Sequence, residues 1–202
     1  MNDSNDKSLA PEYFDNVYNH SDDPWNFASS EYEAAKYAAT VAALPDENYR
    51  SAFEIGCSIG VLTEKLAPLC QTLLAIDVSD KALNRARARC ADLPNVRFQK
   101  MVFPDELPDE NFDLIIVSEV GYYLSATDWK RASGKIISQI EPDGIVMLVH
   151  WTHFVANYPQ TGDAVHDSFA DLSAGKLKHL DAKRTDDYRL DVWRKLLSRT
   201  SG

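Results

Sequence analysis

The fold is decided by two stretches of the sequence, "FEIGCSIG" at 53–60 and "LLAIDVSD" at 73–80. Each is an apolar run that ends in a turn; Gly56 and Gly60 lie in the first turn and Asp77 in the second. Short apolar runs between turn residues predict strands that are buried on both faces. Glycine lets a backbone turn sharply and approach a ligand closely, and a carboxylate accepts hydrogen bonds from two neighbouring hydroxyls. The two turns therefore predict a binding site for a ligand that carries a diol.

The rest of the chain alternates predicted helices with predicted strands. Helices are expected at 30–44, 59–69, 80–93, 127–140 and 163–172, and strands at 51–56, 72–78, 95–101, 113–120, 145–151, 176–184 and 188–195. This alternation predicts an α/β, doubly wound, mostly parallel seven-stranded sheet. Little sequence separates the last two strands, so we expect them to pair as an antiparallel hairpin at or near the edge of the sheet. Ligands bind such sheets at the carboxyl ends of the strands.

The chain of 202 residues suits one domain overall. We expect a disordered tail at 1–12, an N-terminal lid and helix at 13–47, and the ligand-binding domain at 48–200. The segment 13–37 is too aromatic for a linker, and we expect it to fold over the ligand. The alternative is that its aromatic side chains only pack on the domain.

Charge and composition restrict the class of function. The formal net charge is −10, which argues against a duplex-binding surface because phosphate binding relies on clustered Lys and Arg. The longest apolar runs are strand-sized, and the first residues lack the basic start and apolar centre of a secretory signal. The three cysteines have no metal-like spacing. We therefore expect a cytoplasmic protein, monomeric or weakly dimeric, that acts on a small molecule and not on nucleic acid or a membrane.

The glycine turn is not a dinucleotide or phosphate-loop motif. The dinucleotide fingerprint would need glycines at two positions where Ser58 and Val61 stand, and no Gly-Lys-Ser/Thr follows for a phosphate loop. A plainer alternative is that Asp77 only caps the next helix while the glycines form a tight connection.

Four ordered stretches resemble the class I S-adenosylmethionine-dependent methyltransferases: "FEIGCSIGVLTEKLA", "LLAIDVSDKALNRAR", "ELPDENFDLIIVSEVGYYL" and "EPDGIVMLVHW". More narrowly, "DDPWNF", "GCSIGVLTEKLAP" and "SEVGYYL" are similar to the nodulation N-methyltransferases (NodS), which methylate an amino-sugar nitrogen on a chitin-like oligosaccharide. The resemblance implies a Rossmann-like methyltransferase fold. It also implies S-adenosyl-L-methionine as cofactor, with S-adenosyl-L-homocysteine as product, and transfer to an amine of a small-molecule or saccharide acceptor. The alternatives are an O-methyltransferase, a non-catalytic S-adenosylmethionine-binding protein and, disfavoured by Ser58, a nicotinamide-dependent oxidoreductase.

The resemblance also implies which residues hold the cofactor. The glycine turn would hold its methionine end, Asp77 its ribose, and Val78 would press on its adenine. Many family members carry an acid after the third strand that binds adenine, but the stretch 100–103 has none, so backbone groups there would serve instead. The full expected set is Glu54, Gly56, Cys57, Ser58, Gly60, Asp77, Val78, Met101, Val102 and Glu119.

Polar and aromatic residues follow the fourth and fifth predicted strands. Our hypothesis is that Glu119 or His150 accepts a proton from the acceptor or positions it, and that Tyr122 and Trp151 form aromatic walls. The expected catalytic residues are Glu119, His150 and Tyr122; the expected substrate-binding residues are Trp25, Tyr32, Tyr123, Trp151 and His153. The alternatives are that the tyrosines are core or wall residues, that His150 is a hydrogen-bonded structural histidine, and that His153 and His166 lie on the surface. No third ligand stands at zinc-like spacing from the histidines, so we expect no metal.

Overall fold

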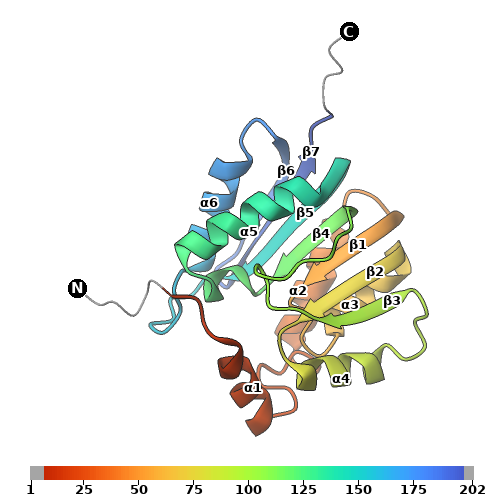
Figure 1. Cartoon of the computed structure of the whole chain (residues 1–202), viewed down its shortest axis with the longest axis vertical. Helices are drawn as coiled ribbons and strands as arrows, with labels where there is room; N and C mark the ends of the chain where they lie inside the picture. The colour runs from red at the N-terminus through yellow and green to blue at the C-terminus, as the bar shows by residue number, and fades with distance from the viewer. Residues whose placement is uncertain (1–6, 198–202) are drawn as a thin grey trace. The chain divides into compact units, whose positions relative to one another are not determined.

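The computed structural model of the protein (Figure 1) describes residues 7–197. These residues divide into two compact units. The N-terminal unit comprises residues 9–107, and the C-terminal unit comprises residues 108–197 together with residues 7 and 8. The expected tail at 1–12 lies partly outside the described residues. The division into one domain with a lid stays a prediction.

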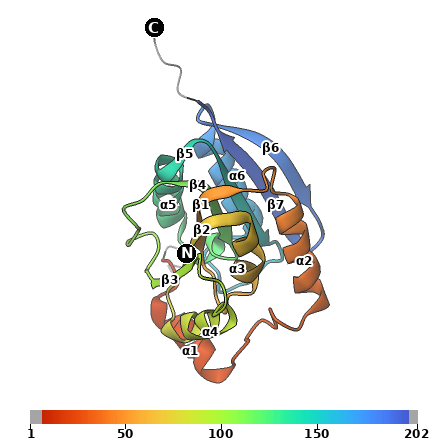
Figure 2. The same cartoon turned by 90° about the vertical axis from the view of Figure 1, so that its right-hand side faces the viewer.

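The N-terminal unit is a parallel sheet with helices. Its strands are β1 (Tyr49–Ile55), β2 (Cys70–Asp77) and β3 (Val96–Lys100), with β2 between the other two. The helices are α1 (Pro11–His20), α2 (Glu31–Ala42), α3 (Val61–Leu66), a short 3-10 turn η1 (Ala67–Leu69) and α4 (Asp80–Arg89). Leu73 to Ile76 are buried along β2, as expected for a strand covered on both faces. Helix α1 lies beside α4 in both views (Figure 1, Figure 2).

The C-terminal unit combines a mixed sheet with two packed helices. Its strands are β4 (Phe112–Ser118), β5 (Ile140–Trp151), β6 (Leu177–Arg184) and β7 (Tyr188–Lys195), and its helical elements are η2 (Gly121–Tyr123), α5 (Ala126–Gln139) and α6 (Gly162–Ser173). β4 pairs with β5 in parallel, whereas β7 pairs antiparallel with both β5 and β6. The order β4-β5-β7-β6 places β6 at the edge, which confirms the predicted C-terminal hairpin. Trp129, Phe169 and Trp193 are fully buried between the layers.

Serine side chains cap the N-termini of two helices. The Ser30 hydroxyl accepts the N–H of Glu33 at the start of α2, and Ser125 accepts that of Asp128 at the start of α5. Ser79 stands at the N-cap of α4 but its side chain does not cap the helix, because its hydroxyl donates to Asp15 of α1 at 2.9 Å. The Ser79 side chain therefore joins two helices.

Two elements differ from the expectation. Helix α1, with Pro11 in its first turn, was not predicted as a helix, because Ala10 at its N-cap has no side-chain oxygen to mark the start. Strand β5 begins at Ile140 and not at 145, and the Pro-Asp-Gly sequence at 142–144 lies inside it, with Asp143 at φ 67°. Within residues 7–197 no helix is both long and apolar enough to cross a bilayer.

Candidate functional site

The glycine turn connects β1 to α3 through three residues in the left-handed region. Gly56 has φ 82°, Ser58 has φ 50° and Gly60 has φ 80°. The backbone N–H groups of Gly56 and Cys57 both donate to the carbonyl of Ile76 in β2, at 2.9 Å. A Cβ on Gly60 would lie 3.0 Å from both Cα and Cβ of Ala86. Gly60 is therefore required for the close approach of α4 to this turn.

The carboxylate of Asp77 joins the two turns that the sequence singled out. Its Oδ2 accepts the N–H of Ser58 and its Oδ1 accepts the N–H of Ser79, both at 2.9 Å. Burial raises the pKa of Asp77 from 3.8 to about 6, although these backbone hydrogen bonds favour the ionised form. Each carboxylate oxygen has a second lone pair, so an ionised Asp77 can accept further hydrogen bonds from a diol.

Glu54 and Cys57 are buried beneath the same turn. Thr63 of α3 donates its hydroxyl to Oε2 of Glu54 at 2.6 Å. Burial, with a smaller contribution from the charge of Asp77, raises the pKa of Glu54 to about 7. Cys57 packs with Ala75 and Leu83 in the core, and its thiol donates to the carbonyl of Ser58 in the turn at 3.8 Å.

The stretch after β3 has its backbone N–H groups engaged within the protein. Met101 donates its N–H to the carbonyl of Asp77 at 3.2 Å, and Val102 donates its N–H to the carboxylate of Glu106 at 2.8 Å. Val78 is partly buried beside Asp77. The contribution of Met101, Val102 and Val78 to ligand binding stays a prediction.

Helix α1 and the segment after it dock onto the glycine turn and α4. The hydroxyls of Tyr18 and Ser58 are hydrogen-bonded, and Asp22 forms an ion pair with Arg85 of α4. Tyr18 is 3% exposed, and burial, then the charge of Asp77, raises the pKa of its hydroxyl well above 10. Sequence reasoning missed Tyr18; the only signal was its place in an aromatic segment. Its ring contacts Trp25 edge-on, with centroids 5.6 Å apart.

The other aromatic residues of this segment lie on or next to α2. Trp25 stacks on Phe27 at 5.4 Å, and Phe27 in turn contacts the buried Tyr37 at 6.5 Å. The ring of Tyr32 lies 5.5 Å from Nζ of the buried Lys36. Trp25 thus belongs to one aromatic cluster with Tyr18, while Tyr32 lies beside the ion pair that Lys36 forms with Glu33. Their roles at a substrate stay a prediction.

The loop after β4 is held by successive residues of β5. Glu119 has φ 58°, a left-handed conformation that a non-glycine residue rarely adopts. Its N–H donates to the carbonyl of Val149, and its Oε2 accepts the N–H of Trp151, both at 2.9 Å. The Tyr122 hydroxyl also donates to Oε2 of Glu119. Strain of this kind persists where the surroundings determine the geometry, and it is common at functional sites.

Tyr122 and Tyr123 are buried next to this loop and contact the partly buried Tyr158. The rings of Tyr122 and Tyr158 stack with centroids 5.2 Å apart, and Tyr123 meets Tyr158 edge-on at 4.8 Å. Burial, then the charge of Glu119, raises the pKa of the Tyr122 hydroxyl. Tyr158 was not singled out by the sequence, because it lies in the irregular segment between β5 and α6.

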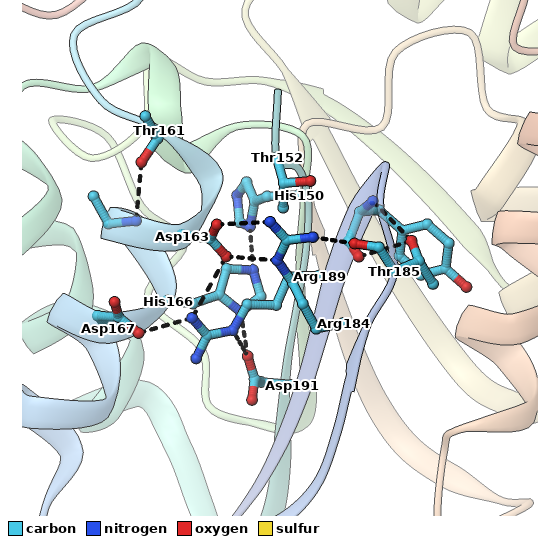
Figure 3. Close-up of polar contacts among 12 residues, drawn as sticks. His150, Thr152, Thr161, Asp163, His166, Asp167, Arg184, Thr185, Arg189 and Asp191 are labelled. Atoms are coloured by element: carbon cyan, nitrogen blue, oxygen red, sulfur yellow. Dashed lines mark hydrogen bonds and ion pairs between the residues drawn. The ribbon is translucent and has the colours of Figure 1, made fainter. Parts of the chain in front are cut away.

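The histidines at the end of β5 and after it have different surroundings. His150 is fully buried: its Nε2 accepts the N–H of Gly121 at 2.9 Å, and its Nδ1 lies 3.0 Å from Nε2 of His166 (Figure 3). The expectation that His166 lies on the surface is wrong, because it lies on the buried face of α6 and is fully buried. His153 is exposed, pairs with Asp187 at 2.8 Å, and lies 4.5 Å from the ring of Trp151. Among residues 7–197, no group of histidine, cysteine and acidic side chains is arranged to hold a metal ion.

The structure thus assembles the predicted site residues in two groups. One group surrounds the glycine turn and Asp77 in the N-terminal unit, and includes Glu54, Cys57 and Ser58. The other surrounds the carboxylate of Glu119 in the C-terminal unit. It comprises Tyr122, Tyr123, His150 and Trp151.

Comparison with known protein families gives a match over most of the chain. The profile of the family "Nodulation protein S (NodS)" matches residues 16–159. The nodulation protein S of Bradyrhizobium diazoefficiens is 36% identical over 124 residues, which is 60% of this chain and 59% of that protein. The nodulation protein S of Rhizobium tropici is 34% identical over 125 residues, 61% of this chain and 52% of that protein. The matching part therefore spans only about half to three fifths of these relatives.

Solved structures show the same fold. A crystal structure from Pseudomonas syringae, described as that of a candidate methyltransferase, is 36% identical with a TM-score of 0.72, and covers 82% of this chain and 100% of that one. The N-methyltransferase NodS of Bradyrhizobium japonicum in complex with S-adenosylhomocysteine has a TM-score of 0.79 at 23% identity, and covers 96% of this chain and 99% of that one. These likenesses confirm the predicted Rossmann-like methyltransferase fold, with seven mostly parallel strands and an antiparallel final strand.

Proposed function

The chain belongs to the Nodulation protein S (NodS) family, which it matches over residues 16–159, and on this premise we propose that it transfers a methyl group from S-adenosylmethionine to an amine of a small-molecule or saccharide acceptor. Its curated relatives bear the name nodulation protein S, and a structure of the same fold is that of an N-methyltransferase with S-adenosylhomocysteine bound. The amine as acceptor follows from that likeness.

The observation that carries the proposal is the position of Asp77. Its carboxylate is held by the N–H of Ser58 from the glycine turn and by the N–H of Ser79 from the start of α4, so it is fixed between the two turns. An ionised carboxylate held in this way has lone pairs left for the two hydroxyls of a ribose. We assign Asp77 to the ribose of the cofactor and the glycine turn, with Glu54 beneath it, to the methionine end.

Other residues of the N-terminal unit complete the cofactor side of the proposal. Val78 would contact the adenine, and Met101 and Val102 would line it, with Tyr18 and Trp25 of the lid covering the turn. The support for the lid is the set of bonds that join α1 and the segment after it to Ser58, Ser79 and Arg85.

On the acceptor side, we assign the proton transfer to Glu119. S-adenosylmethionine, when bound, supplies a methyl group on a sulfonium, which is already activated for displacement. The chain then has to align the acceptor nitrogen with the methyl carbon and to remove the proton that the amine carries. The lone pair of a neutral amine would accept the methyl group while the electrons of the carbon–sulfur bond stay on sulfur, and the carboxylate of Glu119 would take the proton that the nitrogen loses. Tyr122, hydrogen-bonded to Glu119, and Trp151, whose N–H holds the same carboxylate, would bound the acceptor.

The sequence left open whether Glu119 or His150 accepts the proton, and the contacts of His150 favour a supporting role for it. Both of its ring nitrogens are engaged inside the protein, one by Gly121 and one by His166. We therefore propose that His150 supports the loop after β4 and that Glu119 accepts the proton of the amine. Tyr32, Tyr123 and His153 remain proposed contacts of the acceptor.

We also propose that the two units function as one methyltransferase domain, monomeric or weakly dimeric, in the cytoplasm. The three cysteines of the chain are all free and buried, which suits a reducing compartment. The net charge of −10 disfavours nucleic acid as a substrate.

Calorimetry and product analysis test the proposal. Purified protein should bind S-adenosylhomocysteine and should not bind a nicotinamide dinucleotide, and the bound ligand should raise the melting temperature by mass action. Methyl-labelled S-adenosylmethionine with a chitin oligosaccharide that carries one free amine should give an N-methyl product. Failure to bind S-adenosylhomocysteine would overturn the proposal; an O-methyl product, or binding without any product, would replace it by one of the two alternatives.

A further inference from the structure

A chain of buried polar side chains runs from the loop after β4 to strand β7. It comprises His150 of β5, His166 of α6 and Asp191 of β7, which we call the histidine array (Figure 3). All three side chains are fully buried. The Nε2 of His166 lies 3.0 Å from Nδ1 of His150, and the Nδ1 of His166 lies 2.6 Å from Oδ2 of Asp191. Buried groups of this polarity are stable only when each has a partner.

The partners at the two ends of the array determine where its protons lie. At one end the backbone N–H of Gly121 points at Nε2 of His150, so this nitrogen must be an acceptor and the proton of His150 lies on Nδ1. That proton points at Nε2 of His166, which must then accept it, so His166 also carries its proton on Nδ1. This second proton points at the carboxylate of Asp191. Every donor in the array therefore faces an acceptor when both histidines are neutral.

Asp191 anchors the array because it remains ionised. Its carboxylate also accepts from Nε of Arg189 at 2.6 Å and is paired with Nε2 of His179 at 2.7 Å. Burial opposes ionisation, but the hydrogen bonds of His166 and Arg189, with the charge of Arg189 and the charge that His166 gains in acid, outweigh it and lower the pKa of Asp191 to about 2. Burial lowers the pKa of His166, although Asp191 opposes this, so His166 is neutral at neutral pH. Arg189 is held in turn by Asp167 of α6 at 2.7 Å.

The array ends on a backbone amide, and this excludes a relay of protons. Nε2 of His150 faces the N–H of Gly121, which does not exchange a proton with an acceptor at working pH, so no path leads through this nitrogen to a substrate. What the array can do is hold the position of Gly121. There is little space for any other arrangement, because a Cβ on Gly121 would lie 2.5 Å from Cγ1 of Val165 and 3.0 Å from Nε2 of His150.

The position of Gly121 determines that of the Glu119 carboxylate. Glu119 precedes it by two residues, in a left-handed conformation, and Tyr122 follows it and donates to the same carboxylate. The loop is thus held by the carbonyl of Val149, the imidazole of His150 and the N–H of Trp151, three consecutive residues of β5. Of these three contacts, only that of His150 comes from a side chain that can change its proton position or rotate.

We propose that His166 and Asp191 are positioning residues, which act through the tautomer of His150 to hold Gly121 and thereby the carboxylate of Glu119 in place for the acceptor. The catalytic meaning of this assignment rests on the proposed function, because Glu119 matters for turnover only if the protein is a methyltransferase. The mechanical part of the proposal is that Asp191 and His166 hold Gly121 through His150. It does not depend on the reaction and can be tested without an acceptor.

The first measurement uses the wild-type protein. Long-range proton–nitrogen correlation spectra of ¹⁵N-histidine-labelled protein at pH 7 should show both His150 and His166 protonated on Nδ1, with the His166 proton shifted far downfield by the carboxylate. A proton on Nε2 of either residue would overturn the proposal.

The second measurement compares variants by hydrogen exchange with mass spectrometry. His166→Leu removes the acceptor of the His150 proton without changing charge, and should accelerate exchange of the Gly121 amide about tenfold, the effect of losing one net hydrogen bond. His166→Gln offers an oxygen in its place and should restore protection. Asp171→Asn on the same helix changes an exposed side chain and should leave the loop unchanged. Amides in the middle of β4 and β5 serve as internal references.

The outcomes separate positioning from general stability. Equal acceleration in the loop and in the reference strands, or exchange in His166→Gln as fast as in His166→Leu, would show that His166 is merely structural and would overturn the proposal. Binding of S-adenosylhomocysteine is measured on the same samples. If the wild type fails to bind it while the loop behaves as expected, the proposed function fails and the mechanical part of the array stands.

Discussion

Trp151 donates its backbone N–H to the carboxylate of Glu119 at 2.9 Å, and this bond joins the end of β5 to the end of β4. Because the donor is a backbone group, replacing the side chain of Trp151 leaves the bond in place. One of the bonds that orient the carboxylate therefore comes from the sheet, and the chemistry of the carboxylate can be tested by changing Glu119 alone.

Glu119→Gln should lower kcat by about 10²–10⁴-fold, the usual contribution of a general base. Glutamine keeps the size of the side chain and an oxygen that can accept the N–H of Trp151, so the loop should keep its position while basicity is lost. S-adenosylhomocysteine affinity should change far less than kcat. Asp113→Asn, at the opposite end of β4, is the matched control and should leave kcat near the wild-type value. Wild-type turnover in Glu119→Gln would rule out Glu119 as the base.

The affinity for S-adenosylhomocysteine should depend on pH through Asp77. The pKa of this carboxyl is raised to about 6 in the folded protein, and only the ionised form can accept from both ribose hydroxyls while it holds Ser58 and Ser79. Affinity should be constant above about pH 7 and fall toward tenfold per pH unit below pH 6. Calorimetry across this range gives the profile. Asp77→Asn should bind weakly at every pH and lack the inflection.

Acid unfolding does not explain this loss of affinity, because protonation of Asp77 favours the folded state. A carboxyl whose pKa is higher in the folded than in the unfolded state favours folding when it is protonated, so Asp77 itself destabilises the unliganded protein as pH rises through about 6. Glu54, with a pKa of about 7, acts in the same direction. Affinity that stays flat from pH 5 to 8 would contradict the role of Asp77.

Most of the sheet could be predicted because short runs of apolar residues indicate buried strands directly. The runs around Leu74, Ile116 and Met147 form β2, β4 and β5, and the alternating segment at 188–195 is β7. Ser30 and Ser125 mark helix starts because a side-chain oxygen there accepts a backbone N–H. These signals are local in sequence, which is why they were sufficient.

The parts that were not predicted depend on contacts between distant residues. Ser79 had the right position for a cap, but Asp15, far away in sequence, takes its hydroxyl. His166 was expected on the surface because nothing nearby in sequence shows that Asp191 and His150 meet it in the interior. Tyr158 lies in an irregular segment with no periodicity. Contacts of this kind between distant residues cannot be predicted from the pattern of neighbouring residues in the sequence.

The bond between Tyr18 and Ser58 predicts how firmly α1 holds the glycine turn. Tyr18→Phe removes the hydroxyl from a side chain that is 3% exposed, so the Ser58 hydroxyl loses its partner. We expect a loss of about 0.5–1.5 kcal/mol in the docking of α1, seen as faster hydrogen exchange in residues 11–20 and several-fold weaker binding of S-adenosylhomocysteine. Tyr13→Phe alters an exposed ring on the same helix and should change neither. Equal behaviour of the two variants would show that the bond does not hold the lid.

Two glycines of the C-terminal unit should respond in opposite ways to the same substitution. Gly121→Ala would place a methyl group 2.5 Å from Cγ1 of Val165 and 3.0 Å from Nε2 of His150, so α6 or the loop has to move. We expect a fall of about 1–3 kcal/mol in the free energy of unfolding, as for an overpacked core. Gly134→Ala, on the exposed face of α5 with no atom within 4 Å of the new methyl group, should raise it by about 0.5–1 kcal/mol, because alanine loses less backbone freedom in a helix. Urea denaturation measures both values. If Gly121→Ala were as stable as Gly134→Ala, the loop after β4 would not be confined between β5 and α6, and the confinement of Glu119 would have to come from its own backbone bond to Val149.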